Sequence, residues 1–263
     1  FSDAFVDSLS GWRFTGDLHA MSEGTLCFPN EPLARVTAPM REAQLVESRL
    51  INLLHLQTLI ASKAVRCVLA APGKLLVDFG MRRAHGAEAG LCAARASYIA
   101  GFAGSATVLA DQRWGVPSFG TMAHSFIEAH ASEAEAFEHF AHAQPDNVVL
   151  LIDTYDTEEG AKRVAQLAPH LAEKGIRIKS VRLDSGDLNA HARAVRGILD
   201  AAGLKDVHIF VSGGLDEHDL AYLASQCAPI DGYGIGTKLD TSADAPYLDC
   251  AYKLQEYAGT ARR

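Results

Sequence analysis

Charged or glycine-rich clusters that could bind and act on an anionic substrate follow six short apolar runs of this sequence. The clusters are residues 78–83, 120–125, 153–156, 182–187, 212–214 and 234–238. Arg82, Arg83 and Arg182 supply guanidinium groups, which bind carboxylate or phosphate through two parallel hydrogen bonds. Pairing with aspartates of the same clusters is the structural alternative. Because neighbours in an extended segment point to opposite faces, we expect either Arg82 or Arg83 to turn away from a ligand.

Two of these clusters have the composition of a phosphate-binding turn. Gly213 and Gly214 form one, and Gly236 precedes Thr237 in the other. Glycine lets exposed backbone N–H groups approach phosphate oxygens, and a helix that starts nearby adds partial positive charge. Either motif alone could simply form a tight turn. A pair after successive late strands, however, matches the place where βα barrels bind phosphate.

His124 follows an apolar run beside small residues, where an imidazole can act as a nucleophile or as an acid–base group. A packed or solvated histidine is the alternative. The 11 histidines show no ligand spacing such as HExxH, so we expect no metal site built from protein ligands alone. Asp153, Asp156, Asp184 and Asp187 could bind sugar hydroxyls, or hold Mg²⁺ through water together with phosphates. Helix N-capping is the alternative for Asp156 and Asp187.

The clusters lie at the ends of predicted strands, and amphipathic stretches of helical length separate them. The predicted strands are residues 75–79, 116–122, 148–154, 178–184, 208–212 and 233–236, with a shorter one near 107–110. The predicted helices are residues 88–100, 133–141, 158–174, 188–202 and 217–225. This alternation is typical of an α/β protein with a parallel sheet, whose carboxyl strand ends meet at one face. It favours a closed parallel βα barrel, with an open doubly wound sheet as the alternative.

The N-terminal part has a different pattern. Short alternating segments at residues 12–15 and 33–36, separated by turn formers, predict an antiparallel sheet within residues 1–38. Apolar residues recur at helical spacing from 40 to 70, which predicts one or two packed helices. We therefore divide the chain into residues 1–72, a barrel at 73–240, and a C-terminal segment at 241–263 that returns toward the N-terminal part.

Composition narrows the classes of partner. The net charge of −8 argues against a general nucleic-acid or anionic-membrane surface. The five cysteines form no CxxC pair, which favours a reducing cytoplasm over a disulfide framework or a zinc site. The apolar stretches at 98–110 and 148–152 are shorter than the roughly 20 residues that span a bilayer, so we expect no membrane segment. The chain starts at Phe1 without a signal-peptide pattern, so we expect it to begin inside a longer gene product.

In their order and spacing, the motifs resemble those of the nicotinate phosphoribosyltransferase family over nearly the whole chain. They include FGMRRA at 79–84, GTMAHSF at 120–126, VRLDSGDL at 181–188 and SGGLDE at 212–217. The resemblance implies an irregular, TIM-like βα barrel with a smaller appended α/β sandwich-like domain, partly truncated here. It implies transfer of phosphoribose from phosphoribosyl pyrophosphate to nicotinate, giving nicotinate mononucleotide and pyrophosphate for NAD biosynthesis. Mg²⁺ would assist, and ATP hydrolysis would be coupled to product formation.

The resemblance also implies roles for individual residues. Arg82 and Arg182 match arginines that serve the acidic base and the phosphoribosyl substrate, and Asp184 matches an aspartate that contacts ribose hydroxyls. His124 matches the histidine that the family phosphorylates when ATP is used. The remaining residues that we expect to bind substrate are Arg83, Ser125, Asp153, Gly213, Gly214, Gly236 and Thr237.

Departures from the family lie at the two ends of the chain. Family members are generally longer, and a segment upstream of the position of Phe1 usually supplies an aromatic residue that stacks on nicotinate, often across a subunit interface. A cytoplasmic homodimer is the expected form. Nicotinamide phosphoribosyltransferase is one alternative, which the Arg82-Arg83 pair disfavours because a carboxylate needs a cationic partner. A catalytically silent, phosphate-binding barrel protein is the other.

Overall fold

The computed structural model describes residues 1–262, and their contacts divide the chain into two units. The smaller unit contains Phe1–Leu56 and the residues from Tyr247 onward, and the larger one is Gln57–Pro246. All of the parallel sheet belongs to the larger unit.

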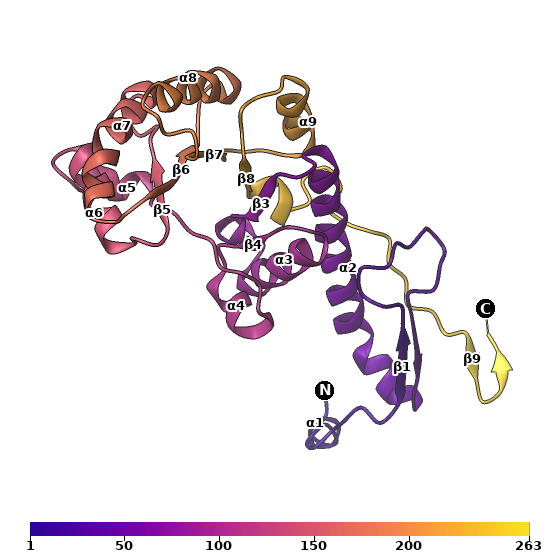
Figure 1. Ribbon diagram of the computed structural model, residues 1–263. Coiled ribbons are helices and arrows are strands. Elements are labelled where there is room, and N and C mark those ends of the chain that lie inside the picture. The colour runs from indigo at the N-terminus through magenta and orange to yellow at the C-terminus, as the bar shows by residue number, and fades with distance from the viewer. Residues whose placement is uncertain (263) are drawn as a thin grey trace. The chain divides into compact units, whose positions relative to one another are not determined.

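A curled six-stranded parallel sheet forms the core of the larger unit (Figure 1). The strand order is β4-β3-β8-β7-β6-β5. The strands are β3 (Leu75–Asp78), β4 (Gly104–Ser105), β5 (Val148–Leu151), β6 (Ile178–Leu183), β7 (His208–Val211) and β8 (Gly232–Ile235). Most of their residues are buried, as expected for parallel strands covered by helices on their faces. The α/β class is therefore confirmed.

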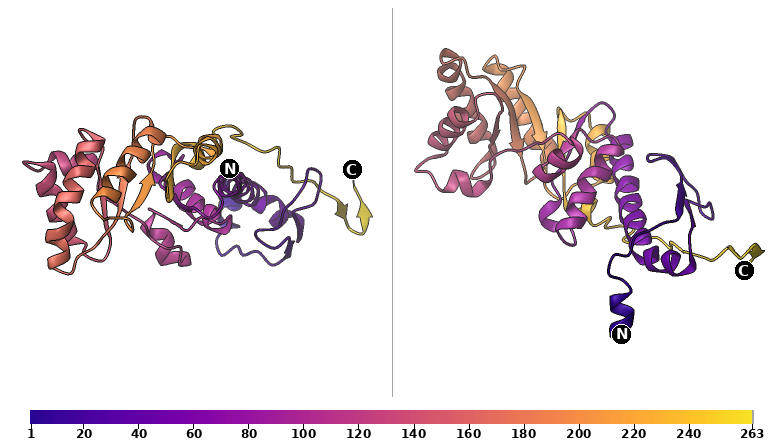
Figure 2. Two further views of the ribbon diagram at one scale, coloured as in Figure 1. Left: turned by 45° about the horizontal axis from the view of Figure 1, so that its top comes forward. Right: turned by 90° about the horizontal axis from the view of Figure 1, so that it is seen from below.

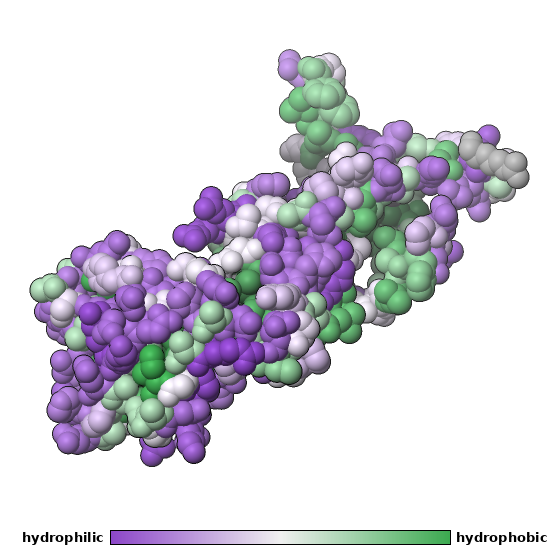
Figure 3. Space-filling view, turned by 90° about the horizontal axis from the view of Figure 1, so that it is seen from above, coloured by the Kyte–Doolittle hydropathy of each residue, from purple (hydrophilic) through white to green (hydrophobic). Residues whose placement is uncertain are grey.

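Helices connect the strands and pack against them. They are α3 (Ala87–Ile99), α4 (Val108–Trp114), α5 (His124–Glu128), α6 (Glu133–Ala143), α7 (Thr157–Glu173), α8 (Leu188–Ala201), α9 (Glu217–Ser225) and the short α10 (Thr237–Asp240). Helices α7 and α8 lie side by side along β5, β6 and β7 (Figures 1 and 2). The visible surface over this region is mostly hydrophilic (Figure 3), as expected for amphipathic helices that bury one face.

Aspartates begin three of these helices. Asp156 accepts a hydrogen bond from the Glu159 N–H at the start of α7, and Asp187 accepts those of Asn189 and Ala190 at the start of α8. Asp216 caps α9 in the same way. Capping is thus the observed role of Asp156 and Asp187, the alternative that the sequence left open.

Residues 116–122 do not form the predicted strand. The Pro117 carbonyl accepts the Ser105 N–H and the Phe119 N–H donates to the Ser105 carbonyl, but the pairing stops there, as a single bridge between Ser105 and Ser118. Further along, the Thr121 hydroxyl donates to the Val149 carbonyl of β5 at 3.1 Å. The segment therefore lies between the two edge strands without a ladder, and Pro117, which lacks an N–H, cannot donate to one. The sheet is curled, but the closed barrel that the sequence favoured is not completed by strand pairing.

The short strand predicted near residues 107–110 is also wrong. The strand is β4, a few residues earlier, and Val108–Trp114 is helix α4. A run of three apolar residues fits either a strand or a buried helix turn, so periodicity does not separate the two.

The smaller unit contains helix α1 (Asp3–Asp7) and two antiparallel pairs of strands. Strand β1 (Asp17–Ala20) pairs with β2 (Ala34–Thr37), and β9 (Glu256–Tyr257) pairs with β10 (Thr260–Ala261). An antiparallel sheet was predicted here, but its first strand begins at Asp17 rather than within residues 12–15.

A single 31-residue helix, α2 (Met40–Ala70), occupies the region predicted to hold one or two helices. Its C-terminal part buries Leu59, Ile60, Ala64 and Cys67 in the core of the larger unit. By length and composition alone, α2 is also apolar enough to cross a membrane, a test that core helices of soluble proteins pass as well.

Candidate active site

Arg182, near the carboxyl end of β6, is the centre of a polar cluster. Its Nη2 donates to Asp184 Oδ1 at 2.7 Å, and its Nε donates to the Ser212 hydroxyl at 2.8 Å. The Ser212 hydroxyl donates in turn to Asp184 Oδ1. The guanidinium also lies 5.5 Å from the centre of the Phe79 ring, within the range of a cation–π contact. The arginine is therefore held in one orientation at 14% side-chain exposure.

His124 lies next to Asp184. Its Nε2 is 3.7 Å from Asp184 Oδ2, and its Nδ1 is 3.1 Å from the Thr154 hydroxyl. Burial raises the pKa of the Asp184 carboxyl, but the charge of Arg182 and the hydrogen bonds from Ser212 and Arg182 outweigh burial, so the pKa lies below its ordinary value. Asp184 is thus ionised at neutral pH, beside an oriented imidazole.

Asp153 joins the end of β5 to the end of β6. Its Oδ2 accepts the Asp184 N–H at 2.8 Å and the Ser185 hydroxyl at 2.7 Å. Its Oδ1 is buried and has no hydrogen-bond partner within residues 1–262. A buried carboxylate oxygen without a partner is costly, so it marks a position where a ligand can bind.

The glycine turns stand at the carboxyl ends of β7 and β8. Gly213 has a φ of 107°, and a Cβ at this position would overlap the Asp184 carbonyl. A Cβ on Gly234 would overlap the Phe79 ring. Gly213, in the turn after β7, and Gly234, inside β8, are therefore both required by close packing, and the turn at Gly213 lies beside the Arg182 cluster.

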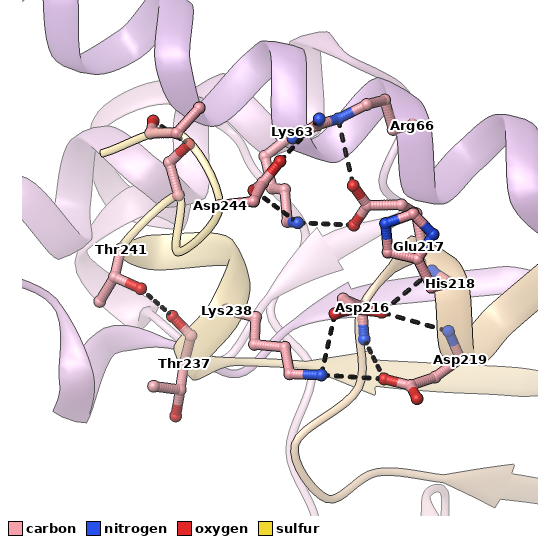
Figure 4. A network of polar contacts seen from close by, with 12 residues as sticks. Lys63, Arg66, Asp216, Glu217, His218, Asp219, Thr237, Lys238, Thr241 and Asp244 are labelled. Atoms are coloured by element: carbon pink, nitrogen blue, oxygen red, sulfur yellow. Dashed lines mark hydrogen bonds and ion pairs between the residues drawn. The ribbon is translucent and has the colours of Figure 1, made fainter. Parts of the chain in front are cut away.

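Ion pairs hold the two helices that follow these turns (Figure 4). Lys63 of α2, with a side chain only 2% exposed, lies 2.6 Å from Glu217 of α9 and 2.7 Å from Asp244 beyond α10. Lys238 of α10 lies 2.8 Å from Asp216 and 3.1 Å from Asp219. Lys238, part of the sixth polar cluster, therefore links α10 to the start of α9 within the structure.

Arg82 and Arg83 lie in a 3₁₀ turn, η1 (Met81–Arg83), directly after β3. Both are exposed, and within the described chain neither forms an ion pair. The expectation that one of them turns away rested on an extended backbone, which the 3₁₀ turn does not have. Asp78, a possible partner, is buried and bonded elsewhere, so the structural alternative does not apply to these arginines.

The structure brings five of the predicted features together around Asp184. His124, Arg182 and Asp153 each contact Asp184, and the turn at Gly213 packs against its carbonyl. Ser125 is exposed in the first turn of α5 and is not linked to the cluster by a hydrogen bond. Three residues that contact the cluster were missed as individual site residues: Phe79, Thr154 and Ser212. Thr154 and Ser212 each adjoin a residue that the sequence did single out, and Phe79 lies three residues before Arg82.

Comparison with known proteins identifies the family. The model of the nicotinate phosphoribosyltransferase family matches residues 75–259, and the model of its N-terminal domain matches residues 1–55. The chain belongs to the nicotinate phosphoribosyltransferase family. The motif resemblance seen in the sequence is thus confirmed.

Relatives and solved structures agree with this assignment. A nicotinate phosphoribosyltransferase of Mycobacterium tuberculosis, pncB2, is 52% identical over 262 residues, which cover 100% of this chain and 56% of the relative. The nicotinate phosphoribosyltransferase of Bacillus subtilis is 42% identical and is covered to 52%. The crystal structure of the human nicotinic acid phosphoribosyltransferase matches with a TM-score of 0.82 at 32% identity, covering 90% of this chain and 58% of that one. The chain therefore spans little more than half the length of these family members.

Proposed function

We propose that this chain carries the phosphoribosyl-transfer site of a nicotinate phosphoribosyltransferase, which forms nicotinate mononucleotide and pyrophosphate from nicotinate and phosphoribosyl pyrophosphate. One observation supports this most: an oriented arginine, an ionised aspartate and a histidine lie together at the carboxyl end of β6, beside the glycine turn that follows β7. This is the face on which parallel βα folds place their chemistry.

The proposed reaction requires stabilisation of developing charge rather than a strong base. The ring nitrogen of nicotinate already has a lone pair, while positive charge grows on the ribose and negative charge leaves on pyrophosphate. The Asp184 carboxylate, held ionised by Arg182, would stabilise the ribose. Gly213, Gly214, Gly236 and Thr237 would receive the phosphates, and Arg82, Arg83 and Arg182 supply cations for the pyrophosphate and the nicotinate carboxylate.

Mg²⁺ fits this site as a partner of the phosphates. Within residues 1–262 no group of three or more His, Cys, Asp or Glu side chains could hold a metal ion alone. Asp153 and Asp184 lie together, however, and the free Oδ1 of Asp153 suits an ion that takes one or two carboxylates plus substrate phosphates. When bound, the ion would neutralise charge on the leaving pyrophosphate.

ATP coupling is proposed to act through His124. The Thr154 hydroxyl is hydrogen-bonded to Nδ1 of His124, and Nε2 of the same ring faces the Asp184 carboxylate. A neutral imidazole is a competent nucleophile near pH 7. A phosphate on His124 would place negative charge beside the Asp184 carboxylate and so change the affinity of the site for its anionic ligands. A homodimer, an appended sandwich-like domain and a cytoplasmic location belong to the same proposal.

The choice of nicotinate over nicotinamide is tested by titrating both bases calorimetrically against the chain in the presence of pyrophosphate. A charged hydrogen bond to the ring carboxylate is worth about 1.5–3 kcal/mol, so nicotinate should bind roughly 10- to 100-fold more tightly. Alanine at Arg82 or at Arg83 identifies the arginine that reads the carboxylate, since only that variant should lose the preference. Equal affinity for the two bases in the parent chain would instead assign it to nicotinamide.

A further inference from the structure

Two buried carboxyl groups lie beside Gly80, directly before the turn that carries Arg82 and Arg83. Asp78 ends β3 with 0% exposure, and Asp240 ends α10 with 3% exposure. Asp78 accepts hydrogen bonds from the Gly80 N–H at 2.7 Å and from the Ser105 hydroxyl at 2.6 Å. Neither oxygen of Asp240 accepts a hydrogen bond from an N–H or O–H donor within residues 1–262. The Asp240 carboxyl packs against Gly80, whose N–H donates to Asp78, so the two carboxyl groups are neighbours.

No cation in the described chain neutralises this pair. Neither carboxyl forms an ion pair within residues 1–262. The charged residues on the elements packed against Asp240 are Arg82 and Arg83 of η1, Glu88 and Arg95 of α3, and Lys238 of α10. Of these, Lys238 is bound to Asp216 and Asp219.

Two buried carboxylates in contact cannot both be ionised. Burial raises the pKa of Asp240 to about 10, and the charge of Asp78 and the hydrogen bond to it act in the same direction. Burial also raises the pKa of Asp78, but the hydrogen bonds from Ser105 and Gly80 oppose it. The pKa of Asp78 stays raised overall, but Asp240 receives no N–H or O–H, so of the two carboxyls Asp240 holds a proton more tightly.

We infer that Asp78 and Asp240 share one proton, and that this bond fixes the turn carrying Arg82 and Arg83 against the helix that follows Gly236. The backbone between them confirms how close the two parts lie, because a Cβ on Gly80 would overlap the Asp240 carboxyl carbon. Both aspartates are positioning residues. They touch no substrate but hold two substrate-binding segments in register, an inference that rests on the proposed function.

The shared proton has a signature in thermal stability. A carboxyl whose folded pKa is about 10, against an ordinary value of 3.8, contributes stability that is fully present below the ordinary value and is lost as pH rises toward 10. Asp240→Asn keeps an N–H donor toward Asp78 at every pH. The Tm of Asp240→Asn, compared with that of the parent, should therefore rise steadily from about pH 5 to about pH 9.

Asp244→Asn is the matched control. Asp244 is paired with Lys63 and Arg66, and the hydrogen bond from Lys63 is the largest cause that lowers its pKa to about 2. The contribution of Asp244 to the free energy of unfolding is lost only as pH falls toward 2. The Tm difference between Asp244→Asn and the parent should therefore be nearly constant from about pH 5 to about pH 9. A constant difference for Asp240→Asn as well would overturn the shared proton.

The positioning role is tested by calorimetric binding of inorganic pyrophosphate to the parent, Asp240→Asn and Asp240→Ala. Asp240→Asn should bind within about 3-fold of the parent, while Asp240→Ala, which removes the link, should bind at least about 10-fold more weakly. If Asp240→Ala does not fold, Gly80→Ala replaces it, since its Cβ displaces the Asp240 carboxyl. Parent-like binding in the disrupting variant overturns the positioning role. A parent that binds no pyrophosphate overturns the proposed function and this role together, while the Tm comparison still decides whether the proton is shared.

Discussion

The Arg182 guanidinium is held on three sides, by the Asp184 carboxylate, the Ser212 hydroxyl and the Phe79 ring. A side chain that is already oriented loses little conformational entropy when an anion binds to it. The structure shows the pairing with an aspartate that the sequence left as one alternative, and we propose that the same guanidinium also binds an anionic ligand.

Arg182→Ala should reduce kcat/KM by roughly 10- to 100-fold or more, because it removes a charged hydrogen bond worth about 1.5–3 kcal/mol and releases Asp184 from its low pKa. Steady-state kinetics and thermal unfolding are measured together. Arg193→Ala, on the surface of α8, is the control and should change neither strongly. A collapsed Tm with preserved turnover would make Arg182 a structural residue only.

His124→Ala should abolish stimulation by ATP while leaving some ATP-independent transfer, because the imidazole is the proposed phosphate acceptor. The parent should carry alkali-stable, acid-labile label on His124 after incubation with γ-labelled ATP. His130→Ala is a suitable control, since His130 follows the same short helix but its Nδ1 bonds the Phe126 carbonyl. An active enzyme whose His124 stays unlabelled would contradict the coupling mechanism.

Most of the central residues could be chosen from the sequence because they lie at or just after the carboxyl ends of apolar runs. Thr154 and Ser212 could not be chosen individually, because their contacts with His124 and Arg182 come from neighbouring strands. Sequence spacing places a residue at a strand end, but it does not specify which hydroxyls of adjacent strands meet. The aromatic position Phe79 was visible in the motif, yet only its distance from the guanidinium reveals its place in the site.

At the scale of elements, the turn after β7 is the most constrained part of the site. Gly213 combines a φ of 107° with a backbone that packs directly on the Asp184 carbonyl. A side chain here would strain the turn and move it away from Asp184.

Gly213→Ala should therefore cost about 1–3 kcal/mol in the free energy of unfolding and weaken binding of phosphoribosyl pyrophosphate. Gly197→Ala, in the interior of α8 with open space around it, should instead stabilise by about 0.5–1 kcal/mol. Denaturant unfolding of both variants gives the comparison. If Gly213→Ala is as stable as the parent and binds as tightly, the turn is not the phosphate cradle.

The βα alternation predicted five of the strands to within a few residues, because buried apolar runs end at polar clusters in both sequence and structure. It failed at residues 116–122, where the composition is that of a strand but only a single bridge forms and Pro117 has no N–H to donate. It failed again at 107–110, where an apolar run too short to show a period is helical. Whether a parallel sheet closes depends on this one segment, which the sequence could not specify.

At the scale of the whole molecule, two units share one chain that spans little more than half of its relatives' length. The candidate site lies within the larger unit, since all of its residues fall between Gln57 and Pro246. The proposed transfer site therefore lies entirely within this unit.

The most direct test is to incubate the chain with nicotinate, phosphoribosyl pyrophosphate and Mg²⁺, with and without ATP, and to measure nicotinate mononucleotide. We predict product that depends on Mg²⁺, rises with ATP and forms roughly 10- to 100-fold or more slowly in Arg182→Ala. If a parent chain that shows a cooperative thermal unfolding transition forms no product at any ATP concentration, the proposed transferase activity is contradicted.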